Sequence, residues 1–382
     1  SRLIRDLGER AAATGERPAI GMHYEMRRPV EWALRDPAAW PQRLSCPPGQ
    51  GVPCVLRYLE AGGRPPIWFL ANPRRTDLAQ IDRRAIREVG RYDWQFEAEA
   101  LTGNPRPNEA VWYELSAPGW FVGAGWALTP ELAGRSAALG KGPSVGPITA
   151  RVRRRPGAAV AILGGRHLGG APSAPGRVEA TIDGRPLVSF EVARDQQFFL
   201  RTIALPPGSL TGAGPFATLS ITADGGGPIA IEQFDLQDDG DVVFGFAEGW
   251  YEPEHDPGCG TSWRWASDRA QLQVHDGGAD VTVSVSVESP RRYFDRAPLV
   301  TLSAGGRTLA HARPEGDFTL TARVPAAALR GANGLITLAT DLSYVPAIRG
   351  ENPDQRRLGL RVYSVSVGRA LDERPGSAAG SR

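Results

Sequence analysis

The residues best equipped for chemistry gather in one stretch, positions 245–265, with the sequence GFAEGWYEPEHDPGCGTSWRW. It combines aromatic rings, carboxylates and a guanidinium. The candidate ligand-binding residues are Trp250, Tyr251, Glu252, Glu254, Trp263, Arg264 and Trp265. Aromatic faces stack on the apolar C–H faces of sugar rings, while charged groups bond the hydroxyls, so this combination indicates carbohydrate recognition.

Two other interpretations of this stretch stay open. Alternation along a strand puts Trp263 and Trp265 on one face and Arg264 on the other. Buried tryptophans are ordinary in β-sandwich cores, so one of these faces is expected in the core. Paired carboxylates can also hydrolyse glycosides, but several acids in one loop do not single out an acid and a base.

Two smaller groups are further candidates for a site. Arg166 and His167 lie among glycines in GGRHLGG, and a turn there would present both side chains to a ligand. Arg74, Arg75 and Asp77 follow the strand-like run PIWFL, where α/β units place functional loops. These three residues can equally form an ion-paired loop.

The familiar catalytic and metal motifs lack their required context. Ser144 lies in GPSVG, but prolines flank it and a strand-like run follows, whereas a nucleophile elbow needs a helix there. The Asp239-Gly240-Asp241 segment resembles a metal-binding D-x-D, yet it falls where a solvated linker is expected. No C-x-x-C or H-x-H spacing occurs. We therefore predict no catalytic residue, no metal site and no cofactor.

Composition narrows the class of protein. The 382 residues include 44 Lys and Arg against 42 Asp and Glu, a balance that gives no reason to expect a nucleic-acid partner. The 46 glycines and 33 prolines favour turns and a mainly β fold. Cys46 and Cys54 bracket a short Pro/Gly loop, so they form either a disulfide or two free thiols.

The ends of the chain suggest that it is a piece of a longer protein. No apolar run approaches the ~20 residues that a membrane helix needs. The first residues, SRLIRD, contain neither an initiator Met nor a signal-peptide core.

Hydrophobic patterning divides the chain. Residues 1–115 mix helical and strand-like runs and predict a small α/β segment, which we expect to be truncated. From residue 116, short alternating runs dominate, as in VTVSVSV at 281–287, where valine recurs at every second position. The residues after 368 are rich in Gly, Ser and Ala and are expected to be disordered.

An internal repeat covers the β region. Gly184, Leu210 and Asp224 match residues 122, 119 and 117 positions further on, and Gly125-Trp126 matches Gly249-Trp250. Two copies of about 120 residues fit two tandem jelly-roll-like β-sandwiches. We expect them at 116–240 and 241–368, with the α/β segment at 1–115 and a tail at 369–382.

Several runs resemble a group of bacterial proteins. They include PIWFLANPRRTDLAQID, PGWFVGAGWALTPELAG, GWYEPE…WRWASDRAQL, SPRRYFDRAP and DQRRLGLRVYSVSV. These look like the C-terminal, extramembrane region of GT-C glycosyltransferases of the protein-mannosyltransferase and aminoarabinose-transferase type. The resemblance spans most of residues 18–368.

The resemblance implies a role for the chain. In such enzymes a sugar is transferred from a polyprenyl-phosphate lipid, and the catalytic acidic residue lies in a loop between the first membrane helices, a part that this chain does not contain. The expected role is that of a non-catalytic accessory region on the periplasmic or cell-surface side, which positions a glycan or glycolipid acceptor and meets the membrane through a missing N-terminal part. The alternatives are a secreted carbohydrate-binding tandem module and a purely structural interaction module.

Overall fold

The computed structural model describes residues 19–22, 51–63, 66–71, 80–94, 108–123, 125–127, 148–169, 175–193, 198–224, 227–256 and 261–370, with Glu9, Ala13, Ser144 and Gly146. The chain divides into two compact units. Unit 1 comprises Ser1–Asp238 and Pro253–Ser262, and unit 2 comprises Asp239–Glu252 and Trp263–Arg382. The predicted mainly β architecture is confirmed, since five sheets account for most of the described elements.

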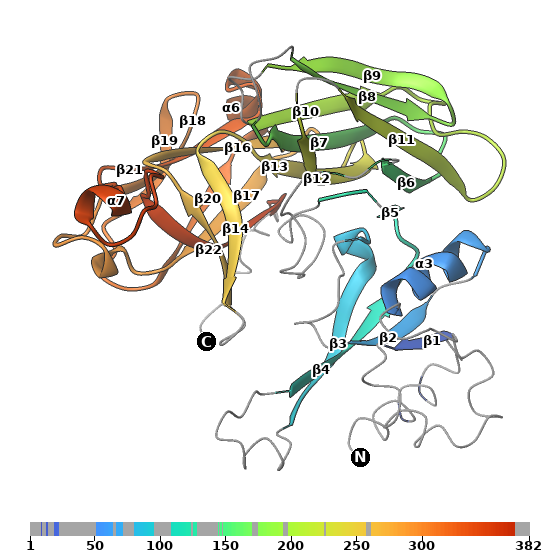
Figure 1. Ribbon diagram of the computed structural model, residues 1–382, viewed down its shortest axis with the longest axis horizontal. Helices are drawn as coiled ribbons and strands as arrows, with labels where there is room; N and C mark the ends of the chain where they lie inside the picture. Colours follow the sequence, from blue (N-terminus) through green and yellow to red (C-terminus); the bar gives the residue numbers. More distant parts are fainter. Residues whose placement is uncertain are drawn as a thin grey trace, which may run out of the picture. The chain divides into compact units, whose positions relative to one another are not determined.

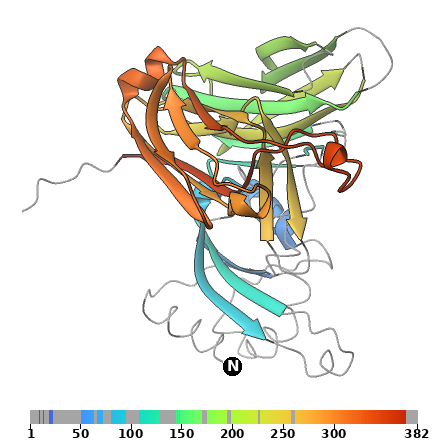
Figure 2. The same ribbon diagram turned by 90° about the vertical axis from the view of Figure 1, so that its left-hand side faces the viewer.

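The N-terminal part of unit 1 is a small α/β layer (Figure 1). Its sheet has the order β1-β2-β4-β3, with β1 parallel to β2 and the other pairs antiparallel. The elements are β1 (Ala19–Met22), α3 (Gly51–Glu60), β2 (Ile67–Ala71), β3 (Ile86–Trp94) and β4 (Asn108–Leu115). Val55 and Leu59 of α3 are buried against Ile67 and Phe69, because apolar residues three and four apart share one helix face. Both views show β3 and β4 running side by side as a long ribbon (Figure 2).

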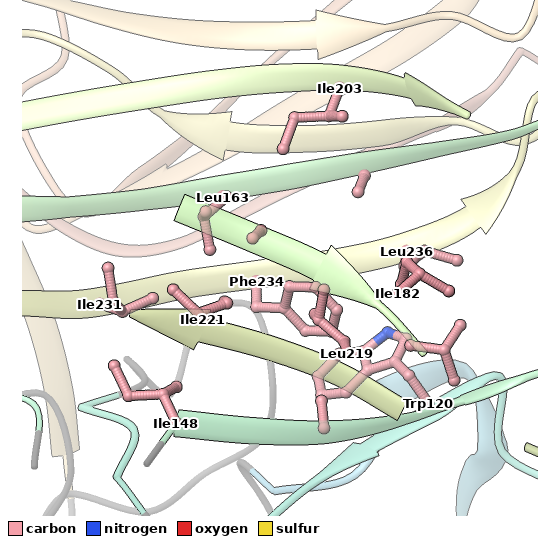
Figure 3. Close-up of a cluster of buried hydrophobic side chains, with 14 of the residues drawn as sticks. Trp120, Ile148, Leu163, Ile182, Ile203, Leu219, Ile221, Ile231, Phe234 and Leu236 are labelled. Atoms are coloured by element: carbon pink, nitrogen blue, oxygen red, sulfur yellow. The ribbon is translucent and has the colours of Figure 1, made fainter. Parts of the chain in front are cut away.

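The rest of unit 1 is a sandwich of two antiparallel sheets, β5-β6-β11-β8-β9 and β10-β7-β12. The strands are β5 (Trp120–Val122), β6 (Ile148–Arg153), β7 (Ala159–His167), β8 (Gly176–Ile182), β9 (Arg185–Val192), β10 (Phe198–Leu205), β11 (Phe216–Asp224) and β12 (Ile229–Asp238). Side chains of both sheets meet in one core, where Trp120 and Phe234 pack edge to face at 4.9 Å (Figure 3).

A polar network joins the two parts of unit 1. The Gln237 amide donates to the carboxylates of Asp82, before the 3-10 turn Arg83–Ala85, and Asp235, at 3.2 and 2.8 Å. Trp120 Nε1 and Arg84 also donate to Asp235, at 2.9 and 2.8 Å. Burial and the neighbouring Asp235 charge raise the pKa of Asp82. Every group in this network has a partner, as burial of polar groups requires.

The second sandwich has two sheets, β13-β16-β21-β18-β19 and β14-β15-β22-β17-β20, and it belongs to unit 2 except for the parts of β14 and β15 that fall within Pro253–Ser262. The strands are β13 (Val243–Phe246), β14 (Trp250–Asp256), β15 (Thr261–Ala266), β16 (Arg269–His275), β17 (Val281–Val287), β18 (Val300–Ala304), β19 (Arg307–Ala312), β20 (Phe318–Val324), β21 (Leu335–Thr340) and β22 (Leu360–Arg369). Two short helices, α6 (Ala326–Gly331) and α7 (Pro346–Arg349), lie in its connections. The part of the chain that the structure describes has no helix long and apolar enough to cross a membrane.

The two sandwiches share one topology, which confirms the predicted tandem repeat. In chain order, β5 corresponds to β13, and β6–β12 correspond to β16–β22. With these equivalents, the sheet order β5-β6-β11-β8-β9 becomes β13-β16-β21-β18-β19, and β10-β7-β12 becomes β20-β17-β22. Beyond β22, two further strands, β15 and β14, continue the sheet of the second copy. The candidate stretch 245–265 supplies most of these two strands.

A repeated Gly-Trp pair stabilises each copy. Gly125 and Gly249 have φ of 93° and 83°, in the left-handed region that side chains disfavour. Each turn directs the next indole inward: Trp126 Nε1 donates to Thr149 O at 2.7 Å, and Trp250 Nε1 donates to Gln271 O at 2.8 Å. At Gly249 an added Cβ would lie 2.0 Å from Arg269 O, so this position requires glycine.

We expect Gly249→Ala to destabilise unit 2 more than Gly278→Ala. Both glycines have left-handed φ, which costs an L-residue about 1–2 kcal/mol. Only at Gly249 does a Cβ also clash with backbone, which adds ~1–3 kcal/mol of overpacking. Differential scanning calorimetry of both variants measures the difference, and equal losses would contradict the packing argument.

Candidate functional site

The site is built on one face of the sheet β14-β15-β22-β17-β20. Along β17 the valines are buried, while Ser284 and Ser286 point to the opposite side, which we call the outer face. Ser284 and Ser286 exchange hydrogen bonds with Thr321 and Thr319 of β20, at 2.8 and 3.0 Å between hydroxyl oxygens. Each hydroxyl has one donor and two acceptor sites, so each retains capacity for a ligand.

Aromatic residues occupy the other end of the outer face. Trp265 of β15 is 7% exposed and packs edge to face on Tyr293 at 5.1 Å. Tyr293 in turn stacks on Tyr344 at 5.8 Å. Trp263 is half-buried, and the Arg361 guanidinium of β22 lies over its ring, 3.6 Å from the centroid. A cation over an indole in this position is attractive.

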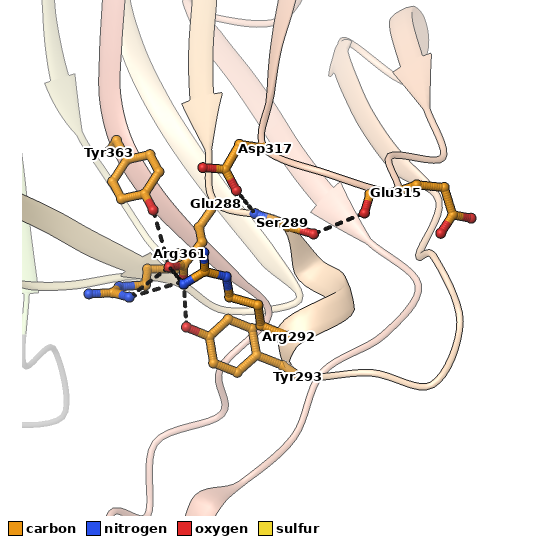
Figure 4. Close-up of polar contacts among 8 residues, drawn as sticks. All are labelled: Glu288, Ser289, Arg292, Tyr293, Glu315, Asp317, Arg361 and Tyr363. Atoms are coloured by element: carbon orange, nitrogen blue, oxygen red, sulfur yellow. Dashed lines mark hydrogen bonds and ion pairs between the residues drawn. The ribbon is translucent and has the colours of Figure 1, made fainter.

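The carboxylate of Glu288 lies at the centre of these contacts (Figure 4). Glu288 is 2% exposed and follows β17. Arg361 Nη1 donates to both of its oxygens, at 2.9 and 3.0 Å. Tyr293 Oη donates at 2.5 Å, Arg292 at 3.0 Å and Tyr363 Oη at 3.1 Å. The buried charge is therefore balanced and saturated with donors, as its burial requires.

These contacts determine the protonation state of the cluster. Burial alone would raise the pKa of the Glu288 carboxyl, but hydrogen bonds from Tyr293 and Arg361 hold it below its ordinary value. Burial and the Glu288 charge raise the pKa of Tyr293 and Tyr363, and burial raises the pKa of Tyr344 to about 12. At neutral pH the cluster thus holds an ionised Glu288 among protonated phenols.

The segment after β17 is anchored independently. Ser289 N donates to Asp317 Oδ1 at 2.7 Å, and Ser289 Oγ donates to the Glu315 carbonyl at 3.1 Å (Figure 4). The 3-10 turn Pro290–Arg292 follows and brings Tyr293 back toward Glu288. The position of Tyr293 is therefore fixed at both its backbone and its hydroxyl.

The structure separates the residues of the stretch 245–265. Trp263 and Tyr251 belong to the aromatic end of the outer face, where they pack against the cluster that contains the buried Trp265. Arg264 points to the other side, where it is buried with its guanidinium 4.7 Å from the Phe246 ring and donates to the Tyr251 carbonyl. Trp250, at 8% exposure, is part of the core.

The two glutamates of the stretch do not face each other across a cleft. Glu252 and Glu254 both lie on β14, with Glu252 exposed and Glu254 half-buried. Tyr251, between Trp250 and Glu252, contacts Arg356 at 5.4 Å and exchanges hydrogen bonds with the Arg357 backbone, both at 3.1 Å. This edge therefore presents an aromatic ring and carboxylates on neighbouring positions of one strand.

The prediction that Arg166 and His167 are presented from a turn is wrong. Both belong to strand β7, because GGRH continues the ladder with β12 despite its glycines. Arg166 is paired with the buried Glu232 at 2.8 Å. His167 is 4% exposed, and its Nδ1 accepts from Gly169 N at 3.2 Å. Gly165 is required here, since a Cβ would lie 1.9 Å from Ala230 O.

The remaining predicted residues lie either away from this site or outside the residues that the structure describes. Arg74, Arg75 and Asp77 lie outside the described residues. Ser144 has a structural role, because its hydroxyl accepts from Ile231 N at 2.6 Å and its own N–H donates to Ile229 O. Cys54 is disulfide-bonded, with its partner outside the described part of the chain. Within that part, no group of three or more His, Cys, Asp or Glu could hold a metal.

Sequence reasoning missed the centre of the cluster. Glu288 and Tyr293 flank the SPRR segment, and Arg361 and Tyr363 lie on β22, more than 70 residues further along. No local pattern marks them as partners. The available signal in the sequence was the isolated Glu288, which directly follows an alternating valine strand.

Comparison with known proteins gives no family. No protein-family model matches the chain, and no curated protein matches it. Among solved structures, it is similar to the CBM22-1–CBM22-2 tandem domain of Paenibacillus barcinonensis Xyn10C, with a TM-score of 0.22 and 11% identity over 77% of this chain and 96% of that one. A Clostridium perfringens ZmpB structure with two CBM51 domains gives 0.17 and 8%, over 74% and 43%. At these scores neither likeness supports an inference about ligands.

We expect Glu288→Gln to destabilise unit 2 by roughly 3–5 kcal/mol, because it removes the buried charge that balances Arg361. A carboxyl with a lowered pKa contributes stability above its unfolded value of 4.5 and loses it as the pH falls through the lowered pKa. The wild type should therefore lose stability on acidification below 4.5, and the variant should lack this component.

The control is Glu315→Gln, which makes the same chemical change at an exposed position. The Glu315 side chain is 77% exposed and forms an ion pair with Arg291. It should alter the free energy of unfolding by no more than about 0.5 kcal/mol. Urea unfolding across pH measures both variants. Equal effects at the two glutamates would show that the saturated contacts around Glu288 do not stabilise the fold.

Proposed function

We propose that the second sandwich binds glycan on the outer face of the sheet β14-β15-β22-β17-β20. The observation that carries this proposal is the half-buried Trp263, fixed by Arg361 and Glu288 beside hydroxyl-bearing strands. The proposal agrees with the predicted carbohydrate recognition by the stretch 245–265. In place of the buried Arg264, the polar contacts with the glycan come from Arg361, Tyr363 and the serine and threonine hydroxyls of β17 and β20.

The chemistry of this face suits sugar rings. A pyranose or furanose has C–H faces that pack on an aromatic ring and hydroxyls that need partners of matching geometry. The face offers a tryptophan and a tyrosine at one end, and rows of Ser and Thr hydroxyls toward the other. Because Arg361 and Tyr293 are already immobilised by Glu288, little side-chain entropy is lost on binding.

The same contacts favour binding over bond cleavage. A glycosidase needs one carboxylic acid to donate a proton and a second carboxylate nearby. Glu288 is ionised, saturated with donors and buried, so it supplies neither a proton nor a nucleophile. Glu252 and Glu254 lie two residues apart on a single strand, not across a scissile bond.

We expect Trp263→Ala to weaken glycan binding about tenfold or more, because it removes the stacking surface at the centre of the face. Trp263→Phe should retain part of the affinity. The matched control is Thr301→Ala on β18 in the opposite sheet, which should bind like the wild type. A glycan array followed by isothermal titration calorimetry makes the comparison, and undiminished binding by a folded Trp263→Ala protein would refute the proposal.

A second proposal concerns the protein that carries this module. The runs that resemble GT-C glycosyltransferase C-terminal regions support an accessory role beside such an enzyme, where the glycan would be an acceptor. The disulfide at Cys54 supports an oxidising, extracytoplasmic compartment.

The coding sequence upstream of Ser1 tests this setting directly. We expect several apolar spans of ~20 residues each, followed by this region. An upstream sequence without such spans would remove the transferase proposal and leave glycan binding by a secreted module intact.

A further inference from the structure

The arginines around the outer face are matched by carboxylates. The ion pairs include Arg361 with Glu288 at 2.9 Å, Arg323 with Asp280 at 3.0 Å and Arg356 with Asp354 at 2.7 Å. Arg356 binds its partner through two nitrogens, in the fork geometry that makes such pairs strong. A hydrogen bond from Ala326 N and one from Arg323 lower the pKa of Asp280, and hydrogen bonds from Arg356 lower the pKa of Asp354, so both carboxylates are ionised at neutral pH.

An anionic ligand would therefore have to compete with carboxylates already in place. At Arg361 the competitor is buried and holds both the guanidinium and its neighbours, so displacing it would leave an uncompensated charge. A neutral ligand meets no such cost. It can use the ring of Trp263 and the hydroxyl groups, whose hydrogen bonds do not depend on charge.

The face also has a direction. Trp263 belongs to β15, Tyr363 to β22, Ser286 to β17 and Thr319 to β20, four successive strands of the sheet. Neighbouring strands lie about 4.8 Å apart, so this set of aromatic and hydroxyl groups extends over roughly 14 Å. That length accommodates several sugar rings, and a single ring would meet only part of it.

Resting on the proposed function, we propose that the outer face takes a neutral oligosaccharide stretch, laid across the strands from Trp263 toward Thr319, and discriminates against acidic glycans. Stacking and neutral hydrogen bonds supply its affinity, and Arg361 and Arg356 serve to hold Trp263 and Tyr251 in place.

The test uses the full chain and two classes of probe. The neutral probes are xylan, mannan and arabinan oligosaccharides, and the acidic probes are oligogalacturonate and alginate oligosaccharides. We expect at least one neutral probe to bind, and its Kd should change less than about twofold between low and high salt. The Debye screening length falls from ~30 Å to ~3 Å over that range, which weakens only contacts between charged groups. For the neutral sugar that binds, its pentasaccharide should bind at least tenfold more tightly than its monosaccharide.

Two variants sharpen the result. Ser286→Ala with Thr319→Val should weaken the pentasaccharide while leaving the monosaccharide unchanged, because these hydroxyls lie two and three strands from Trp263. Arg323→Gln, which removes a paired cation from β20, should leave neutral binding unchanged. Binding confined to acidic probes, with a tenfold loss in high salt or in Arg323→Gln, would overturn this inference and preserve glycan binding. Failure of every probe to bind would overturn the proposed function and this inference with it.

Discussion

The ion pair between Glu288 and Arg361 is the constraint on which the candidate site depends. A carboxylate buried at the end of β17 is unfavourable unless it is paired and hydrogen-bonded. Meeting that requirement draws in a guanidinium and two phenols from two segments of the chain, Arg361 and Tyr363 from β22 and Tyr293 from the turn after β17. Arg361, once fixed, covers Trp263, and Tyr293, once fixed, supports Trp265. One electrostatic requirement thus turns separate aromatic residues into a rigid surface.

The two copies share one scaffold. Both copies use the same strand order and the same Gly-Trp turn, in which a left-handed glycine directs an indole to a strand carbonyl. Beside β12, the described residues of the first copy include Ser144, which bonds the edge of this strand. In the second copy β15 pairs with β22 and brings two tryptophans. The core specifies the fold, and we place the proposed ligand chemistry at the edge of the second copy, because a fold alone does not determine function.

Sequence patterns succeeded where structure is local. The alternation in Val281–Val287 predicts a half-buried strand because side chains alternate between faces, and the repeat offsets predict two sandwiches because they recur in register. Prediction failed at Arg166 and His167, where glycine-rich sequence indicated a turn. The ladder with β12 and the close approach of Ala230 account for those glycines within a strand. A glycine needed for close backbone approach and one needed for a turn look alike in sequence.

The sequence by itself determined the mainly β class, the tandem copies and the aromatic stretch at 245–265. These follow from periodicity and composition, which act over a few residues. Only the tertiary structure decided which tryptophan is accessible and which charged group supports it. Trp250 and Trp263 are chemically identical, yet Trp250 is buried and donates to a core carbonyl, while Trp263 is half-buried with an arginine from β22 against its ring. Such pairings arise when strands about 100 residues apart are brought side by side in one sheet, and no local pattern encodes them.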